Sequence, residues 1–185
     1  MGIISNIKEN IARHTLKKDA AKVSRNRVMA SFSDVKSVGV IYLLQDEQTY
    51  KTVADFVAKL QGQHKQIKVI GAFAGQIQPV YYIPKLSFDL LMMKDVNWVG
   101  IPKAEFVHPF LKEEFDVLFL LSQSKNMSLE YLYALSHAKL KVAADCAEIN
   151  LYSDLMFKVG KDNFLQKLID TSVHYLQVIN KKDDK

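Results

Sequence analysis

Short continuous apolar runs alternate along the chain with segments of helical periodicity. The runs "SVGVIYLL" (37–44) and "QIKVIGAF" (66–73) have the length and β-branched content of strands buried on both faces. Between them, apolar residues recur on one face of a predicted helix: Tyr50, Val53, Val57 and Leu60. Asp46 precedes this helix as its expected N-cap. The three segments predict a βαβ unit with parallel strands.

The same alternation returns in the second half of the chain. We predict a strand over Phe115–Leu121, a helix over Ser128–Ala138 and a strand over Leu140–Ala144. A short edge strand is expected within 149–160. An amphipathic helix over 161–180 then carries its apolar stripe at helical spacing: Phe164, Leu165, Leu168, Ile169, Ser172, Tyr175, Leu176 and Ile179. Alternating strands and helices predict a three-layer α/β fold with a mostly parallel sheet, Rossmann-like or flavodoxin-like.

The periodicity blurs between residues 74 and 114. "PVYYIP" (79–84) is predicted as a short strand with prolines at its ends. The segment 85–102 fits a third strand or a helical turn equally well, and 103–114 fits a loop or a short helix interrupted at Pro109. Trp98 is expected to anchor its loop on the core, with stacking on a ligand as the alternative.

The net charge of +5 belongs entirely to the N-terminal segment. Residues 1–27 carry two acids and seven bases, whereas the rest of the chain carries 18 of each. The seven bases are Lys8, Arg13, Lys17, Lys18, Lys22, Arg25 and Arg27. We therefore divide the chain into a basic helical arm (1–33), one α/β domain (34–180) and a solvated tail (181–185).

Three roles are open for this arm. Its apolar stripe, formed by Ile4, Ile7 and Ile11 and continued by Leu16, Ala20 and Val23, could pack on the domain and leave the bases in solvent. The clustered bases could instead bind nucleic acid by releasing counterions, or lie on an anionic membrane surface. Because the arm has no aromatic residue before Phe32, it lacks stacking platforms and membrane anchors.

Several classes of protein and site are disfavoured by what the sequence lacks. A single cysteine, Cys146, excludes an intramolecular disulfide and a cysteine-built zinc site. No apolar run is long enough to span a bilayer, and no secretory signal is evident, so we expect a cytoplasmic protein. We find no glycine-rich phosphate loop, no nucleophile elbow and no histidine pair at metal-ligand spacing. Accordingly, we predict no catalytic residue, metal or cofactor.

The candidate ligand-binding residues come from topology. Loops at the carboxyl ends of parallel strands share one edge of a sheet, where open α/β folds bind ligands. We nominate the residues that follow the three clearest strands: Asp46, Ser122, Ser124, Asn126 and Asp145. The loop 122–126 could bind an anion together with the following helix N-terminus. In the alternative, Asn126 or Ser128 caps that helix and the serines fill a turn.

The chain also resembles a known family across 25–180. The segments that carry the resemblance are "KSVGVIY", "LSFDLL", "KDVNWVGIP", "EEFDVLFLLSQ", "LEYLYALSHAKLKVAA" and "YSDLMF". They are similar to an uncharacterised family of small α/β proteins from Bacteroidetes, whose members have a basic helical arm. The run from Phe115 to Ala143 is also similar to the N-terminal half of heptosyltransferase-type glycosyltransferases. That likeness implies a fold and no activity.

Two functional hypotheses follow. In the first, a non-catalytic α/β protein docks its basic arm on an acidic partner, such as RNA, a ribonucleoprotein or another protein. In the second, the protein binds or converts a small molecule, a nucleotide or nucleotide sugar, at the carboxyl ends of the strands. A homodimer through an open sheet edge or the last helix is a further expectation.

Overall fold

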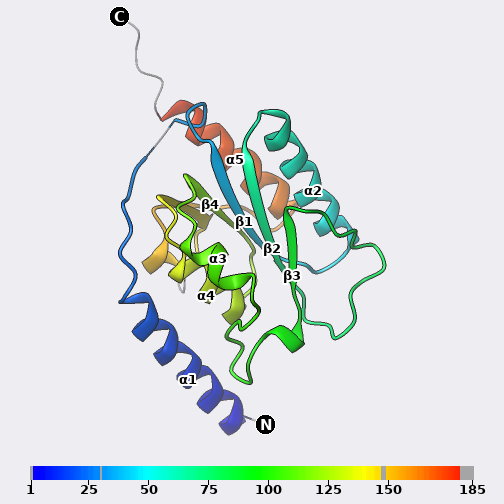
Figure 1. Ribbon diagram of the computed structural model, residues 1–185, viewed down its shortest axis with the longest axis vertical. Helices are drawn as coiled ribbons and strands as arrows, with labels where there is room; N and C mark the ends of the chain where they lie inside the picture. Colours follow the sequence, from blue (N-terminus) through cyan, green and yellow to red (C-terminus); the bar gives the residue numbers. More distant parts are fainter. Residues whose placement is uncertain (1, 30, 147–148, 180–185) are drawn as a thin grey trace, which may run out of the picture.

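The described strands form one six-stranded sheet in which every neighbouring pair is parallel. The computed structural model describes residues 2–29, 31–146 and 149–179 (Figure 1). In order across the sheet, the strands are β3 (Phe88–Leu91), β2 (Gln66–Ala72), β1 (Ser37–Leu43), β4 (Val117–Leu121), β5 (Leu140–Ala144) and β6 (Leu155–Phe157). This is the doubly wound order of Rossmann-like proteins, so the predicted fold class is confirmed.

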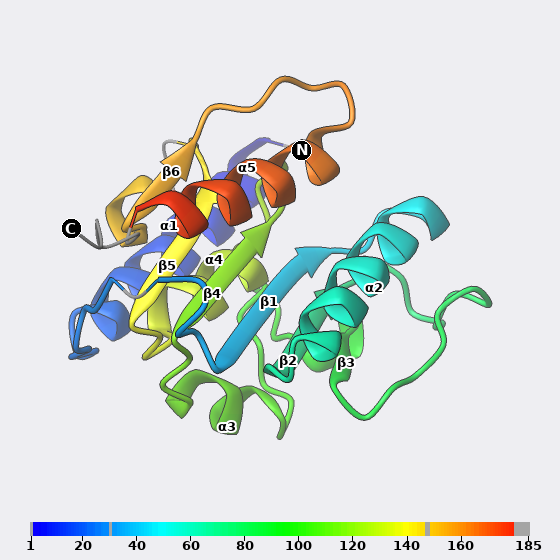
Figure 2. The same ribbon diagram turned by 90° about the horizontal axis from the view of Figure 1, so that it is seen from above.

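Helices cover both faces of the sheet, and one more helix lies outside them (Figure 2). The helices α2 (Glu47–Gly62) and α5 (Phe164–Val178) pack on one face. The other face is covered by α3 (Val107–Lys112) and α4 (Met127–Leu135). The long helix α1 (Gly2–Ala20) contacts α4 from outside. Two short 3₁₀ turns, Met93–Asp95 and Asn150–Tyr152, complete the described elements.

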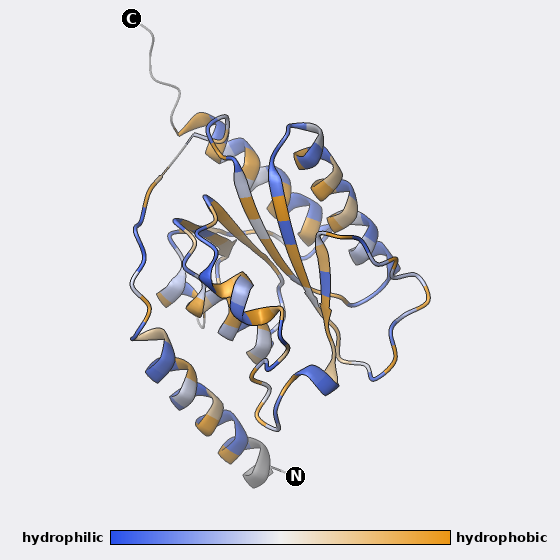
Figure 3. Cartoon of the chain, in the orientation of Figure 1, coloured by the Kyte–Doolittle hydropathy of each residue, from blue (hydrophilic) through white to orange (hydrophobic). Residues whose placement is uncertain are grey.

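The continuous apolar runs form strands rich in hydrophobic residues (Figure 3), and these strands bury side chains on both faces. In β1, Val40 and Tyr42 join the core beneath α2 and α5, while Ile41 joins the core beneath α3 and α4. Alternate residues of a strand point to opposite faces, so a strand covered twice has no polar face. This accounts for the lack of period-two alternation in the sequence.

The short strand predicted at 79–84 is absent, whereas segment 85–102 holds both a strand and a helical turn, the two alternatives left open for it. Residues 79–84 form a turn and loop, and β3 lies at Phe88–Leu91 instead. Tyr82 is the buried anchor of the loop, its ring 5.3 Å from that of Tyr50, whose hydroxyl donates to the Ile83 carbonyl at 3.0 Å. Aromatic anchoring of a loop therefore produced an apolar segment that resembles a strand. Four apolar side chains of the same loop are exposed: Ile77, Val80, Ile83 and Leu86.

Two further expectations for this region are corrected. Trp98 does not anchor its loop on the core, since it is 65% exposed and its neighbour Val99 is the buried residue. Pro109 lies inside α3, in the first turn, where the missing N–H costs no helical hydrogen bond. The short helix therefore continues through the proline.

The arm helix docks on the domain through the later part of its predicted apolar stripe, and not through Ile7 and Ile11. Ala12 and Leu16 are buried, and Leu16 contacts the cluster at the C-terminal half of α4. Ile7 and Ile11 are exposed. The predicted stripe is therefore right in its continuation, since Leu16, Ala20 and Val23 pack in this cluster, and wrong for Ile7 and Ile11; the Ile4 side chain lies outside the described residues.

The predicted solvated tail, 181–185, lies outside the described residues. Within the residues that the structure does describe, no helix is both long and apolar enough to cross a bilayer.

Candidate functional site

The sheet has a topological switch point between β1 and β4. From β1 the chain continues outward through β2 to β3, and it then returns to the other side of β1 to form β4. The connections that leave β1 and β4 therefore diverge to opposite sides of the sheet. In open α/β sheets, the crevice between such diverging loops is the usual ligand site.

A crevice of about 600 Å³ lies at this switch point. Its walls come from the loop after β1, the first turns of α2, the loop after β4 and the segment that leads into α5. Most lining side chains are polar: Gln45, Asp46, Gln48, Thr49, Thr52, Ser122, Gln123, Ser124, Lys161, Asn163, Gln166 and Lys167. Leu43, Leu121, Phe164 and Leu165 form the apolar part.

Three of the five predicted ligand-binding residues meet in this crevice, namely Asp46, Ser122 and Ser124. Asn126 does not line it, because its side chain caps α4 and accepts the Leu129 N–H at 3.1 Å. Asp145 follows β5, one strand further from the switch point, and accepts a hydrogen bond from Asn150. Of the two roles considered for Asn126, capping of the helix is therefore the one observed.

The predicted residues that do line the crevice are fixed by local hydrogen bonds. One carboxylate oxygen of Asp46 accepts both the backbone N–H and the hydroxyl of Thr49, each at 2.7 Å. These hydrogen bonds lower the pKa of Asp46. The Ser122 hydroxyl donates to the Ser124 carbonyl at 3.1 Å and accepts the Ser124 N–H at 3.2 Å. Because Asp46 stays ionised as a helix cap, it is a poor general base.

The start of α5 supplies crevice residues that the sequence reasoning missed. Lys161 and Lys167 are exposed and line the crevice with Asn163, the N-cap residue of α5. Asn163 has a left-handed backbone (φ 49°), and its side chain makes no capping hydrogen bond. The first N–H groups of α5 and two ammonium groups therefore make this wall positive. Only the tertiary return of α5 to the switch point brings these residues there.

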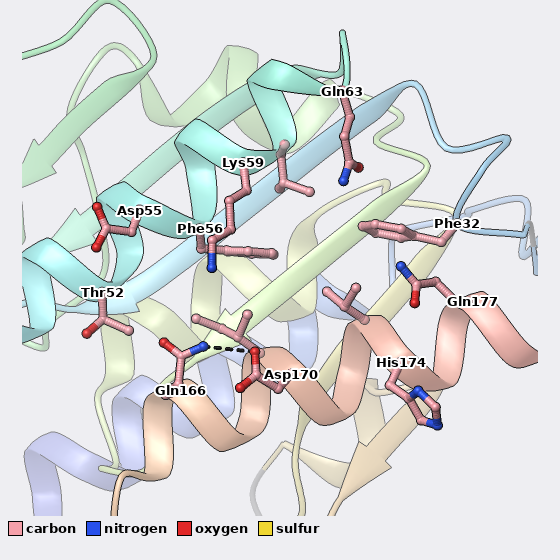
Figure 4. A pocket seen from close by; sticks show the side chains of 13 residues that line it. Phe32, Thr52, Asp55, Phe56, Lys59, Gln63, Gln166, Asp170, His174 and Gln177 are labelled. Atoms are coloured by element: carbon pink, nitrogen blue, oxygen red, sulfur yellow. Dashed lines mark hydrogen bonds between the residues drawn. The ribbon is translucent and has the colours of Figure 1, made fainter.

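An apolar groove between α2 and α5 adjoins the crevice (Figure 4). It holds about 200 Å³, and Phe32 and Phe56 face into it. On its rim, the Gln166 side-chain amide donates to Asp170 at 2.8 Å. Thr52 and Gln166 line both hollows, so the groove continues into the crevice.

The arm cations divide into two groups. Four of them form ion pairs within the chain: Arg13 with Glu9 and Glu130, Lys22 with Asp19, and Arg25 and Arg27 with Asp154. The other three, Lys8, Lys17 and Lys18, are exposed and form no ion pair with any described residue. The arm therefore presents fewer available charges than its sequence implies.

Across the described part of the chain, no three histidine, cysteine or acidic side chains gather in a group that could hold a metal ion.

Comparisons with known proteins add a family and a fold. A family model described as a family of unknown function (DUF6913) matches residues 8–179. No curated protein matches the chain. Among solved structures, the chain is similar to the glycosyl transferase family 9 protein from Veillonella parvula DSM 2008, with 12% identity and a TM-score of 0.48. That match covers 84% of this chain and 44% of the glycosyltransferase chain, so this chain spans less than half of that protein's length.

Proposed function

Since the chain belongs to this family of unknown function, DUF6913, we propose its function from its own geometry: the protein binds a small anionic molecule in the switch-point crevice. The observation that carries the proposal is the coincidence of the crevice with the switch point of a doubly wound sheet. Its volume is within the range of roughly 300–1,000 Å³ that is usual for ligand pockets.

The charge of the lining favours an anion. Lys161 and Lys167 outnumber the one carboxylate in the described lining, and that carboxylate, Asp46, already accepts two hydrogen bonds from Thr49. The N-terminus of α5 adds a partial positive charge to the same wall. A phosphate or carboxylate is the group that such a wall binds best.

The adjoining groove indicates which kind of anion fits. A ligand that placed its anionic end against Lys161 and Lys167 could extend past Gln166 onto the apolar surface of Phe56. Nucleotides and nucleotide sugars combine a phosphate with a flat ring, so they are the ligand class that we propose.

Calorimetry and thermal shift with a panel of nucleotides and nucleotide sugars test this function. A ligand at about a hundred times its Kd should raise Tm by roughly 5–10 °C. The double variant Lys161→Gln/Lys167→Gln should weaken binding at least about tenfold, because two charge-assisted contacts are lost. The double variant Lys94→Gln/Lys103→Gln is the matched control, since both lysines are exposed and line neither the crevice nor the groove.

Failure of every nucleotide and nucleotide sugar to stabilise the protein at millimolar concentration would contradict the proposal. Equal weakening by the double variant and by the control would show non-specific charge attraction and would also contradict it.

A second candidate function is docking of the arm on an acidic partner, such as RNA or an acidic protein. The favouring observation is that Lys8, Lys17 and Lys18 on α1 are exposed and form no ion pair with a described residue. Replacing all three by Gln should weaken RNA binding and flatten its salt dependence by a slope of about 2–3, since fewer counterions are released. Unchanged binding across a salt titration would exclude the arm. Homodimer formation, a cytoplasmic location and an origin in Bacteroidetes stay predictions.

A further inference from the structure

A second cavity lies on the other side of the molecule from the α2–α5 groove, where the arm crosses the domain. It holds about 400 Å³ between the end of α1 with the segment that follows it, α4, β5 and the turn before β6. Arg25, Arg27 and Lys141 line it, together with Ser24 and Tyr152. No acidic side chain belongs to this described lining.

The charges around this cavity do not balance. Among the described residues, Asp154 is the one carboxylate that pairs with its cations, and it is shared between two arginines. Arg25 holds it through two hydrogen bonds, at 2.6 and 2.7 Å, and is almost fully buried. Arg27 lies 3.6 Å from the same carboxylate and remains 70% exposed. With Lys141 protonated, three positive charges therefore face one negative charge.

The excess of positive charge is least favourable at Lys141. Its side chain is 1% exposed, and its amine donates to one acceptor among the described residues, the Ala134 carbonyl at 3.0 Å. Burial first, and then the charge of Arg25, lowers the pKa of Lys141 to about 7. The Tyr133 ring lies 5.6 Å from this amine, and of the three donors of the protonated form two have no oxygen or nitrogen acceptor within the described chain. The buried positive charge of Lys141 is removed when the amine loses a proton, and it is stabilised when an anion binds beside it.

We propose that the cavity between the arm and β5 is a second ligand site, which binds a dianionic phosphate group between Arg27, Arg25 and Lys141. The excess of two positive charges matches a phosphate dianion or the phosphate of a monoester, and exceeds the single charge of a diester. Phosphate oxygens also supply hydrogen-bond acceptors for the Lys141 ammonium and for the exposed guanidinium of Arg27. This site shares no residue with the crevice and does not depend on the function proposed for it.

Binding at this site takes up a proton. The bound dianion stabilises the ammonium form of Lys141, so affinity falls as the pH rises through about 7, where the free amine becomes neutral. The other charged or titratable groups facing Lys141 are Arg25 and Arg27 from the arm, Asp154 before β6, Tyr133 on α4 and Tyr152. Both arginines stay charged, and burial raises the pKa of both tyrosines above 10. Sulfate is the probe for this effect, because it remains a dianion throughout.

Calorimetry of the full chain with inorganic phosphate, at ionic strength matched with chloride, tests the site. The titrations are run in the Lys161→Gln/Lys167→Gln background so that the crevice does not contribute. Arg27→Gln should weaken phosphate binding about tenfold, and Lys17→Gln, an exposed arm cation outside the cavity, should change it by less than about twofold. Lys141→Met should remove the pH dependence of sulfate binding and leave the protein folded.

Separate titrations with glycerol phosphate, dimethyl phosphate and single-stranded RNA identify the source of the phosphate. Tighter binding of free phosphate or of the monoester than of the diester supports the site and names its ligand. Tighter binding of the diester, RNA binding that Arg27→Gln weakens more than it weakens phosphate binding, equal losses in the Arg27 and Lys17 variants, pH-independent sulfate binding, or no heat with phosphate above that with chloride would overturn it.

Discussion

Lys141 shows how far the surroundings of one side chain change its chemistry. It is a lysine within an otherwise apolar strand, fully buried and close to two arginines. In the folded protein its pKa is about 7, against an ordinary value of 10.5. Between these values the unfolded chain binds more protons than the folded one, so stability rises with pH across this window.

Lys141→Met should remove this rise. The variant buries a similar volume without a charge, so below pH 7 it should be about 2 kcal/mol more stable than the natural chain. The measurement is urea unfolding at several pH values in phosphate-free buffer. Parallel stability curves of the two proteins from pH 6 to 10 would contradict the assigned cost.

Gly39 is the residue that allows the closest packing in the sheet. A Cβ at this position would lie 2.8 Å from Leu118 and from the Phe115 ring, which are both fully buried. Gly39→Ala should therefore destabilise the fold by about 1–3 kcal/mol, because neither neighbour has room to move. Denaturant unfolding measures the change. Gly62→Ala is the control, with no atom within 4 Å of the added methyl; equal stability of both variants would refute the packing argument.

At the scale of elements, α1 is attached to α4 by a small contact. Leu16 is the most deeply placed large side chain among those described in α1. The hydrogen bond of Tyr131 to Asp19 (3.2 Å) and the ion pair of Arg13 with Glu130 (3.5 Å) add to the contact. Burial of one leucine contributes about 2 kcal/mol, so this helix depends on few interactions.

Leu16→Asp should release the arm and leave the sheet intact. We expect proteases to cleave within residues 8–22 while a fragment containing the sheet survives. Lys17→Asp changes the same helix at an exposed position and should stay resistant. Resistance of the Leu16 variant would mean that other contacts, such as those of Arg25, suffice to hold the arm.

The whole molecule has a stable centre and weaker edges. β1 and β4 are bonded on both sides and covered on both faces, whereas β3 and β6 are edge strands of four and three residues. Local opening costs least where contacts are few.

Hydrogen exchange should therefore follow the strand order. Peptides covering 38–42 and 117–121 should exchange last, and those covering 88–91 and 155–157 first, by a factor of about a hundred or more. Mass spectrometry of exchanged peptides gives this ranking. Equal protection of edge and centre would indicate that something covers the edges in solution, as the predicted homodimer would.

Sequence reasoning located the elements whose hydrophobic pattern has one structural explanation. It failed where two different structures produce the same pattern. The continuous runs of β1, β2, β4 and β5 were correct, because burial on both faces leaves a plain signature. The segment 79–84 was wrong, since aromatic anchoring of a loop resembles a strand. The arm stripe was right at Leu16 and wrong at Ile7 and Ile11, because helical spacing defines a face of the helix without defining which turns of that face contact a partner.

The sequence by itself determined the layers of this protein, the location of its excess charge and three of the residues at the switch point. These features follow from periodicity, composition and the geometry of parallel strands, all of which can be recognised within short segments of the sequence. Tertiary structure alone decided that Lys161 and Lys167 reach the crevice, and that Arg25, Arg27, Asp154 and Lys141 surround one cavity. Such groups are far apart in the chain, and their charges act on one another only after the fold excludes water between them.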